Sequence, residues 1–343
     1  MEPFKLTQFS HGAGCGCKIS PALLEKILKT ELPKGSFPSL LVGNESRDDA
    51  AVYDIGGGKC IVSTTDFFMP IVDDPFTFGG IASVNAISDV YAMGGTPVMA
   101  IAILGWPINK IPAEVAKHVL DGSRSVCEEA GIPLAGGHSI DCPEPVFGLA
   151  VTGILNGSNL KKNNTARAGS LLYLTKPLGV GIVTTAEKKG IVKDHHLQKA
   201  IQSMLKLNKL GVLLGELDYV SALTDVTGFG LLGHLNEVCE GSGLSADIIF
   251  DRVPQFDFLK EYIDQQSIPG GTTRNWDSYG ARISPLNDFQ KAVLADPQTS
   301  GGLLIAVDKS NQLEFEELCG KNGHDLTPFG KLVAENPVRI QVK

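Results

Sequence analysis

The chain has 343 residues, of which 43% are hydrophobic and 20% are charged, and its formal net charge is −8. This length predicts a soluble protein of about two domains with a sizeable core. The acidic balance argues against a nucleic-acid surface, because binding to phosphate backbones requires a basic face. No apolar run of about eighteen residues is present, so no membrane span is expected. Seven scattered cysteines favour the reducing cytoplasm over a disulfide framework.

The N-terminal segment contains the stretch HGAGCGCK, from His11 to Lys18. Its glycines permit positive φ and close approach to a ligand. A lysine beside thiols favours the reactive thiolate, so Cys15, Cys17 and Lys18 predict a mobile arm that handles a nucleophile or a chalcogen. An ordered turn with inert thiols is the alternative. The Cys-x-Cys pair supplies only two of the four ligands of a zinc site, and a disulfide within it would be strained.

A helix follows the arm, with Ser20 as its N-cap and Pro21 in its first position. Residues 50–68 form two β-rich runs around three glycines, which predicts a hairpin. The GGGK sequence in that turn lacks the flanking residues of a Walker loop. Helices are expected at 76–93, ended by Gly94 and Gly95, and from about Pro112 to Ala130. Strands are expected at 132–141 and 146–155.

Residues 156–169 are polar and rich in turn formers, which predicts a domain boundary. The expected organisation is an arm (1–19), an N-terminal domain (20–156) and a C-terminal α/β domain (157–343). The second half predicts a strand at 171–177, a glycine-rich turn at 178–182 with a helix after it, and a helix at 195–211 that carries His195 and His196 on the surface. A strand–turn–helix at 219–243 and a helix–turn–strand at 291–307 follow. Both halves mix helices and strands, so the expected class is α+β, in two layers each.

Five aspartates stand before strands, at strand ends or inside an apolar helix: Asp48, Asp49, Asp66, Asp89 and Asp225. Aspartate is unfavourable within a helix, and a carboxylate among apolar residues is costly unless it is paired or binds a metal. Asn85 lies four positions before Asp89, on the same helix face. Several carboxylates at one place would suit Mg²⁺ that bridges phosphates. Caps and turns are the alternative, and they are the favoured interpretation for Asp48 taken alone.

Other motifs leave two interpretations open. The turns at 227–233 and 298–302 fit anion binding or tight glycine packing equally well. His11 and His138 each lie beside a glycine, where they would contact phosphate or solvent. Four further cysteines are expected to be structural: Cys60, Cys127, Cys142 and Cys239.

The motifs HGAGCGCKIS, NESRDDAAV, STTDFF, NAISDVYAMGG, AGGHSID, LTDVTGFGLLGH and DPQTSGG occur in this order. Together they closely resemble the selenophosphate synthetase (selenide, water dikinase) family, from about His11 to Ile305. The aspartate motifs are shared with the wider aminoimidazole ribonucleotide synthetase superfamily, whereas the first motif is specific to the family.

The resemblance implies that ATP, selenide and water yield selenophosphate, AMP and orthophosphate on a homodimer, with a selenium-delivery protein as a further candidate partner. It also implies that the N-terminal domain (20–156) binds ATP and magnesium and forms the dimer. It implies catalytic roles for Cys15 and Lys18. It implies that Mg²⁺ is held by Asp49, Asp89 and Asp225. The implied nucleotide contacts are Lys18, Ser46, Arg47, Asp48, Asp66, Asp89, Gly137, His138 and Ser139, the last three from the partner subunit.

The chemistry of phosphoryl transfer agrees with these roles, because it requires charge neutralisation and positioning more than covalent help. Hydroselenide is already an anionic nucleophile, so Cys15 is expected to carry or guide selenium and not to abstract a proton. Thiamine-monophosphate kinase would share the aspartates but gives no reason for the thiol arm. A hydrogenase-maturation enzyme would end in cysteine, whereas this chain ends VRIQVK. A non-catalytic metal scavenger would leave the aspartates unexplained.

Overall fold

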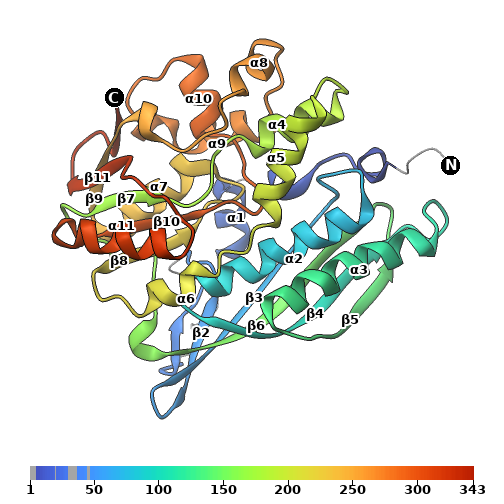
Figure 1. The fold of residues 1–343 in the computed structure, drawn as a ribbon, viewed down its shortest axis with the longest axis horizontal. Helices are drawn as coiled ribbons and strands as arrows, with labels where there is room; N and C mark the ends of the chain where they lie inside the picture. The colour runs from blue at the N-terminus through green and yellow to red at the C-terminus, as the bar shows by residue number, and fades with distance from the viewer. Residues whose placement is uncertain (1–4, 20, 30–36, 45–46) are drawn as a thin grey trace.

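The computed structural model describes residues 5–19, 21–29, 37–44 and 47–343. Within these residues it forms two six-stranded sheets, in the orders β1-β2-β3-β6-β4-β5 and β12-β9-β11-β7-β10-β8. Figure 1 shows the first sheet with its helices at the lower right and the second sheet with its helices at the upper left. The predicted α+β class with two halves is therefore confirmed.

The N-terminal half contains strands, α-helices and short 3₁₀ turns. The strands are β1 (Leu40–Val42), β2 (Ala51–Gly56), β3 (Lys59–Phe68), β4 (Thr96–Trp106), β5 (Leu134–Asp141) and β6 (Val146–Asn156). The helices are α1 (Pro21–Leu28), α2 (Pro75–Ala92) and α3 (Ala113–Ala130), and the 3₁₀ turns are η1 (Leu6–Phe9), η2 (Gly14–Cys17) and η3 (Gly157–Asn159). The predicted hairpin and both long helices are confirmed, with ends that differ by one or two residues. Ser20, the expected cap of α1, lies outside the described residues.

The C-terminal half follows the segment for which the sequence predicts a boundary. Its strands are β7 (Leu171–Leu174), β8 (Val220–Asp225), β9 (Leu244–Ile248), β10 (Leu303–Val307), β11 (Gly330–Ala334) and β12 (Ile340–Val342). Its helices are α4 (Val180–Lys188), α5 (Asp194–Leu205), α6 (Leu210–Gly215), α7 (Gly230–Ser242), α8 (Leu259–Asp264), α9 (Gly270–Tyr279), α10 (Asp288–Leu294) and α11 (Gln312–Lys321). None of the described helices combines the length and apolar composition needed to cross a bilayer.

Two predictions about the helix at 195–211 were wrong. The helix ends at Leu205, because the buried amide of Asn208 donates hydrogen bonds to Ser88 Oγ (2.8 Å) and Gly301 O (2.9 Å) and holds the chain in a turn. His196 is buried and not on the surface. Its ring stacks on Phe258, with centroids 3.7 Å apart, and its Nδ1 bonds the Tyr262 hydroxyl at 2.6 Å. These tertiary contacts are not visible in the helix pattern.

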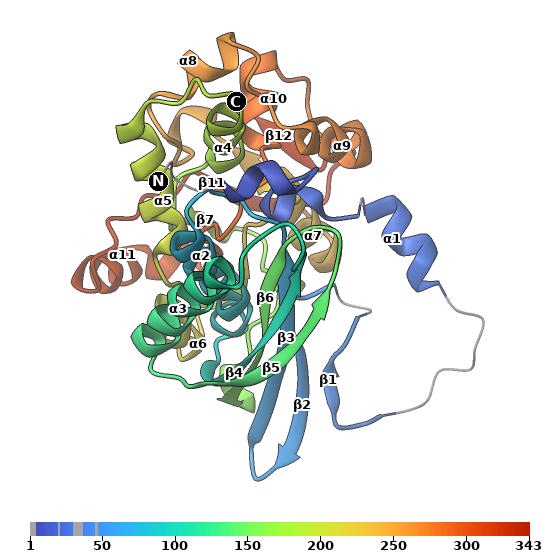
Figure 2. The same cartoon turned by 90° about the vertical axis from the view of Figure 1, so that its right-hand side faces the viewer.

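Helix α2 lies between the two halves of the molecule. Every residue from Phe78 to Ala92 is buried, because α2 packs on β3 and β6 on one side and on α5, α6 and β8 on the other. A helix that is covered on all sides is expected to be mostly apolar around its whole circumference, as α2 is. Gly79 allows α3 to approach closely, since an added Cβ would lie 1.8 Å from Val119 O. Figure 2 shows α2 and α3 on one face of the N-terminal sheet, and no helix of the described residues covers the opposite face.

The alternation of β3 divides its side chains between these two faces. Val62, Thr64 and Asp66 point toward α2, whereas Ile61 and Phe67 point to the exposed face. The inward-facing polar residues of β3, Thr64 and Asp66, therefore lie against α2. This placement builds the candidate site.

Candidate functional site

The aspartates predicted as a set converge from four segments of the chain. Asp49 precedes β2, Asp66 lies near the end of β3, Asp89 lies on α2 and Asp225 ends β8. The charges of Asp225, Asp89 and Asp48 all act on the Asp49 carboxyl, and those of Asp225 and Asp66 act on Asp89. The sequence analysis was therefore right to expect that these carboxylates lie together.

Hydroxyl groups fix the orientation of three of these carboxylates. Thr224 donates from Oγ1 to Asp49 Oδ1 at 2.9 Å, and Thr64 donates to Asp89 Oδ2. Ser88 hydrogen-bonds Asp225 and lowers the pKa of that carboxyl. Thr224 and Ser88 each directly precede another aspartate in the sequence, and Thr64 lies two positions before Asp66.

Burial and mutual repulsion raise the pKa of Asp49 and of Asp89 well above the usual range. Burial also raises the pKa of Asp225, while Ser88, His234 and Lys18 oppose that rise. Asp49 is partly exposed as a residue, but its Oδ2 atom is buried, as is Asp225 Oδ2, and neither atom has a hydrogen-bond partner among the described residues. Buried carboxylates in this state favour a bound cation.

The carboxylates do not form a ready-made chelate. In the described part of the chain, no group of three His, Cys, Asp or Glu side chains is close enough to hold a metal ion by itself. A cation at this place would therefore need further oxygen ligands from water or a substrate.

Asp66 connects the carboxylates to the N-terminal arm. It accepts a hydrogen bond of 2.7 Å from Asn85 Nδ2, and Lys18 Nζ lies 3.4 Å from its Oδ2. Asn85 in turn accepts from the Ser300 backbone amide at 2.7 Å. Asn85 was noticed in the sequence only for its position on the face of Asp89, yet it links β3, α2 and the turn at 298–302.

The arm is seated between the two halves. Its η2 turn is held by a hydrogen bond of 3.1 Å from Gly14 N to Met69 O at the end of β3. Gly14 has φ +51°, and an added Cβ would lie 2.4 Å from Thr299 Oγ1, so only glycine fits this contact. His11 is exposed and pairs with Glu144 at 2.9 Å. The side chain of Cys15 lies outside what the structure describes.

The loop before β2 is hydrogen-bonded to Asn163, which lies in the segment that joins the two halves. Asn163 donates from its backbone N to Asp48 Oδ1 at 2.8 Å and from Nδ2 to Arg47 O at 2.9 Å. Arg47 adopts φ +53°, an unfavourable conformation for a residue with a side chain, and the two Asn163 bonds help to hold it there. Ser46 lies outside the described residues.

Three predicted nucleotide contacts do not join the site within one chain. Gly137, His138 and Ser139 lie on β5, which is separated from β3 by β6 and β4. Three strand spacings correspond to about 14 Å. Gly137 allows β5 to pair closely with β4, because an added Cβ would lie 2.3 Å from Ala102 O on β4.

Sequence reasoning missed several polar residues of the site. Thr64 and Thr224 lie inside the motifs STTDFF and LTDVTGFGLLGH, and their position close to the aspartates is the signal that could have found them. No pattern in the sequence pointed to Lys176. It is 3% exposed, donates to Ser300 O at 2.9 Å, and lies near enough to Asp225 for that carboxylate to act on it. Burial lowers the pKa of Lys176 to about 7.

The glycine turns are explained by packing. An added Cβ at Gly301 would lie 2.0 Å from Val226 O, and one at Gly302 would lie 2.4 Å from Lys176 N. Gly230, with φ +70°, packs on the backbone of Ala295. Of the four cysteines expected to be structural, Cys60, Cys127 and Cys239 are buried free thiols, whereas Cys142 is half-buried and donates to Glu144 O at 2.8 Å.

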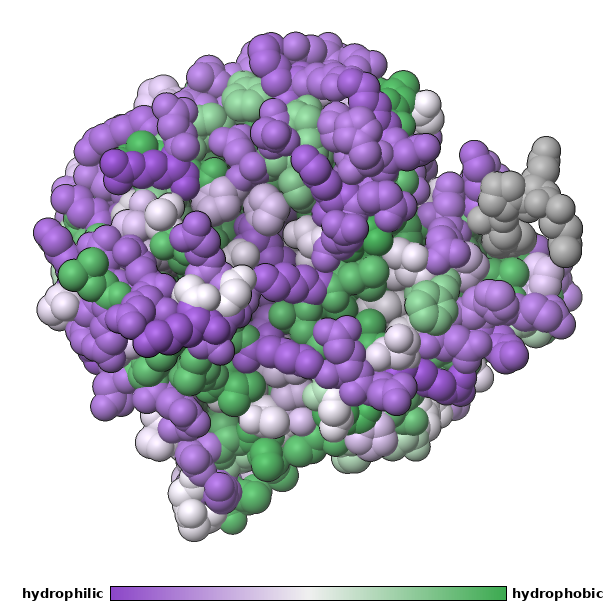
Figure 3. All heavy atoms as spheres, in the orientation of Figure 1, coloured by the Kyte–Doolittle hydropathy of each residue, from purple (hydrophilic) through white to green (hydrophobic). Residues whose placement is uncertain are grey.

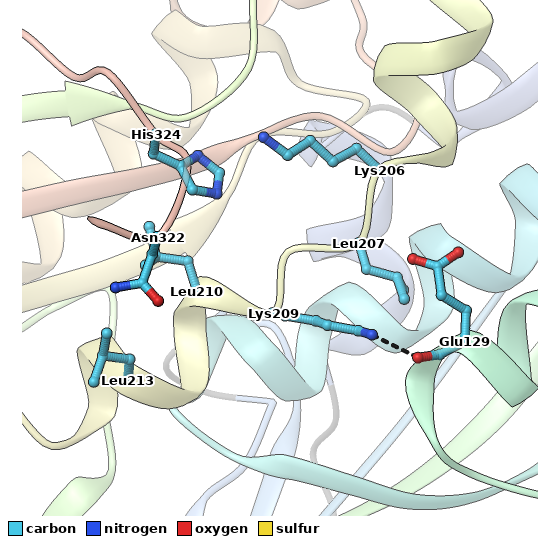
Figure 4. Close-up of a pocket in the computed structure, with 8 residues that line it drawn as sticks. All are labelled: Glu129, Lys206, Leu207, Lys209, Leu210, Leu213, Asn322 and His324. Atoms are coloured by element: carbon cyan, nitrogen blue, oxygen red, sulfur yellow. Dashed lines mark hydrogen bonds between the residues drawn. The ribbon is translucent and has the colours of Figure 1, made fainter. Parts of the chain in front are cut away.

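A pocket of about 310 Å³ lies away from this site, between α6, the end of α3 and the loop after α11. Figure 4 shows Lys206 and His324 facing each other across it, while Lys209 donates to the Glu129 carbonyl. None of the predicted site residues lines this pocket.

Comparison with known proteins identifies the family and supports the fold. The model of the AIR synthase related protein, N-terminal domain, matches residues 47–155, and that of the C-terminal domain matches residues 167–343. A selenide, water dikinase of Colwellia psychrerythraea is 60% identical over 334 residues, which is 97% of each chain. One from Pasteurella multocida is 58% identical over 341 residues, 98% of this chain and 97% of the other.

The chain belongs to the selenide, water dikinase family. It is therefore an enzyme, and the family membership confirms the resemblance carried by the motifs.

Solved structures support the family's fold. Thiamine-monophosphate kinase of Stenotrophomonas maltophilia matches with a TM-score of 0.66 at 18% identity, over 89% of this chain and 92% of the other. Hydrogenase maturation protein HypE matches with a TM-score of 0.62 at 17% identity, over 87% and 86%. At these identities the likeness concerns the fold alone.

Proposed function

We propose that this chain converts ATP, selenide and water into selenophosphate, AMP and orthophosphate. The observation that carries the proposal is the contact of Lys18 with Asp66, 3.4 Å apart. It brings the Cys-x-Cys arm, specific to the family in sequence, to the buried carboxylates. Carboxylates alone suit many nucleotide enzymes, whereas a thiol-bearing arm beside them suits a selenium substrate.

Magnesium fits the carboxylates by their chemistry. The buried, unpartnered Oδ2 atoms of Asp49 and Asp225 are suited to a cation, and Asp89 lies close enough to raise the pKa of Asp49. These three residues would hold Mg²⁺, which supplies charge neutralisation to the triphosphate when bound. Mg²⁺ usually keeps waters and phosphate oxygens among its ligands, so an incomplete protein chelate is what a Mg²⁺–ATP site requires.

The arm supplies the remaining groups. Lys18 is the cation nearest to Asp66 in the seated arm, and it is the residue to contact the ATP phosphates. Seating of η2 against β3 and Thr299 covers the site and limits the access of water. Cys15, in the η2 turn, is assigned to carry or guide selenium, because hydroselenide needs no general base.

A homodimer explains the bare face of the N-terminal sheet. Ile101, Phe67 and Ile154 are 45%, 51% and 45% exposed on β4, β3 and β6. Figure 3 shows apolar side chains gathered over the lower part of the molecule, while the C-terminal half is mostly polar. An apolar sheet face of this kind favours a second copy of the chain as its cover. His138 and Ser139 on the exposed β5 edge would then reach the partner's nucleotide.

The test is AMP formation from ATP by the purified protein, followed by ³¹P NMR with and without selenide under anaerobic conditions. Selenide should raise AMP formation and give a selenophosphate resonance. Lys18→Ala should abolish both, whereas Lys59→Ala, which removes an exposed lysine bonded to Asn156, should not. Cys15→Ser with full selenide-dependent AMP formation would contradict the role of that thiol.

Two other outcomes would favour other functions. Phosphorylation of thiamine monophosphate without a response to selenide would identify a kinase of the wider superfamily. Stoichiometric zinc retained by a protein that does not bind nucleotide would favour a metal scavenger.

A further inference from the structure

Arg274 on α9 makes a contact with the arm that the proposed reaction does not explain. Its Nη2 donates a hydrogen bond of 2.8 Å to the carbonyl oxygen of Gly16. Arg274 is exposed, and within the described residues this is the one hydrogen bond of its side chain. Figure 2 shows the blue N-terminal segment at the boundary between the two halves, with α9 close by.

The carbonyl oxygen of Gly16 is a favourable acceptor for the guanidinium group of Arg274. Gly16 lies in η2, a single 3₁₀ turn whose last carbonyls have no partner within the turn. A cationic donor at such a carbonyl forms a charge-assisted hydrogen bond, which is stronger than a neutral one. Gly16 stands between Cys15 and Cys17 and two residues before Lys18, so fixing its carbonyl fixes the backbone that carries all three.

The surface around Arg274 is shaped to receive the arm. An added Cβ on Gly16 would lie 3.6 Å from Pro297 Cγ, so the arm already rests on the turn after α10. An added Cβ on Gly271 would lie 3.6 Å from Gly16 O and 3.0 Å from Pro297 Cγ. The absence of a side chain at Gly271 leaves room for the Gly16 carbonyl beside α9.

The arm is anchored on both halves of the chain. On the N-terminal half, Gly14 N bonds Met69 O and Lys18 contacts Asp66. On the C-terminal half, Lys188 Nζ donates to Ser10 O at 3.4 Å and Arg274 donates to Gly16 O. Of these two C-terminal anchors, Arg274 is the one whose hydrogen bond reaches residues 15–18 of the arm.

We propose that Arg274 is a positioning residue that holds the arm in its seated state and acts through the Gly16 carbonyl on Cys15 and Lys18. The proposal rests on the role of the arm given under the proposed function. Within the part of the chain that the structure describes, Arg274 makes no hydrogen bond or ion pair with the carboxylates, and its effect is on how much of the time the arm covers them. Loss of the bond leaves the site intact but lets water compete with selenide.

The test combines hydrogen–deuterium exchange with turnover, using Arg274→Gln in the full chain. Exchange of the backbone amides of residues 12–19 should become about fivefold faster, the effect of losing one exposed charge-assisted bond. Selenide-dependent AMP formation should fall by a similar factor, while ATP hydrolysis without selenide should not fall. A residue needed only for stability would lower both reactions together.

Two further variants complete the design. Arg274→Lys keeps a cationic donor and should restore part of the protection. Arg124→Gln removes an exposed arginine on α3 that pairs with Asp121 at 2.9 Å. It should change neither the amide exchange of residues 12–19 nor the rate of selenide-dependent AMP formation.

The outcomes separate this proposal from the proposed function. Unchanged exchange in Arg274→Gln overturns the positioning role, whatever the activity. Faster exchange with unchanged selenide-dependent turnover overturns its link to the reaction. If the unaltered protein forms no AMP in response to selenide, the proposed function fails, and the exchange measurement still decides whether Arg274 seats the arm.

Discussion

Thr224 donates a hydrogen bond of 2.9 Å to Asp49 Oδ1, and the two residues are 175 positions apart in the sequence. Thr224 belongs to β8 of the C-terminal sheet, whereas Asp49 lies in the loop before β2 of the N-terminal sheet. The bond therefore joins the two halves at the candidate magnesium site. It also lowers the pKa of a carboxyl that burial and neighbouring aspartates raise.

Thr224→Val should weaken the use of magnesium, because valine has the shape of threonine but cannot donate this bond. A hydrogen bond to a charged group contributes about 1.5 kcal/mol, so the magnesium concentration for half-maximal AMP formation should rise about tenfold. A magnesium titration at saturating ATP measures this. Thr184→Val is the control, since its hydroxyl bonds Val180 O within α4. An unchanged magnesium requirement in Thr224→Val would mean that Asp49 is held without Thr224.

Asp225→Asn should stabilise the protein while it abolishes activity. The carboxylate of Asp225 is buried, and its Oδ2 has no hydrogen-bond partner among the described residues. Asparagine keeps an acceptor for Ser88 and removes one charge from the cluster. Loss of about 1 kcal/mol of repulsion should raise the thermal midpoint by about 2 °C without ligand.

Ligand dependence separates this effect from a general gain of stability. Magnesium and ATP together should raise the midpoint of the unaltered protein but not that of Asp225→Asn, because a ligand stabilises only the state that binds it. Thermal scans with and without the ligands provide the comparison. Equal stabilisation of both proteins would remove Asp225 from the metal site.

The aspartates could be predicted because local patterns expose them. Asp89 interrupts a helix that is otherwise apolar, and Asp66 and Asp225 fall near or at strand ends, where they break a hydrophobic run. The same patterns predicted the helices α2 and α3 and the hairpin of β2 and β3. In each case, neighbouring residues along the chain carry the information.

Contacts between distant segments could not be predicted in this way. The bonds of Thr224 to Asp49 and of Arg274 to Gly16 depend on how the two sheets pack around α2, and one sequence holds no local sign of that packing. The burial of His196 was missed for the same reason, since Phe258 and Tyr262 cover it from another helix and its loop. Expectations for Gly137, His138 and Ser139 remain predictions that require a second chain.

Ile101→Asp should convert a dimer into monomers. Ile101 is 45% exposed on the bare face of β4, where a charge would be buried on association at a cost of several kcal/mol. Light scattering after gel filtration measures the mass. Selenide-dependent activity should fall with the dimer, because β5 of the partner is proposed to contact the nucleotide. Leu313→Asp, at a position 81% exposed on α11, is the control. A monomeric mass for the unaltered protein would refute the assignment of this face.

Asp296 gives the chain a pH-dependent stability that can be removed by one substitution. Its Oδ2 accepts hydrogen bonds from Gly181 N (2.9 Å) and Gln298 Nε2 (2.8 Å), but its Oδ1 is buried with no partner among the described residues. Burial raises the pKa of Asp296 to about 8, although the hydrogen bonds from Gln298 and Gly181 oppose the rise. The folded protein therefore keeps this carboxyl protonated at neutral pH.

The sign of the effect follows from proton binding. Between about pH 4 and pH 8 the unfolded chain has lost the proton of this residue and the folded chain has kept it, so stability falls as the pH rises, by about 1.4 kcal/mol per pH unit. Asp296→Asn cannot ionise and lacks this slope. The free energy of unfolding of the variant, relative to the unaltered protein, should therefore increase by about 2 to 3 kcal/mol between pH 5 and pH 7.

Urea denaturation at pH 5, 6 and 7 measures the difference. Asp264→Asn, an exposed residue paired with Lys260, serves as the control and should show no such increase. The comparison across pH matters more than the absolute stability of Asp296→Asn, because the new amide nitrogen is itself buried and costs some free energy at every pH. A constant difference between variant and unaltered protein from pH 5 to pH 7 would show that Asp296 is ionised in the folded chain, and that the two hydrogen bonds to Oδ2 outweigh its burial.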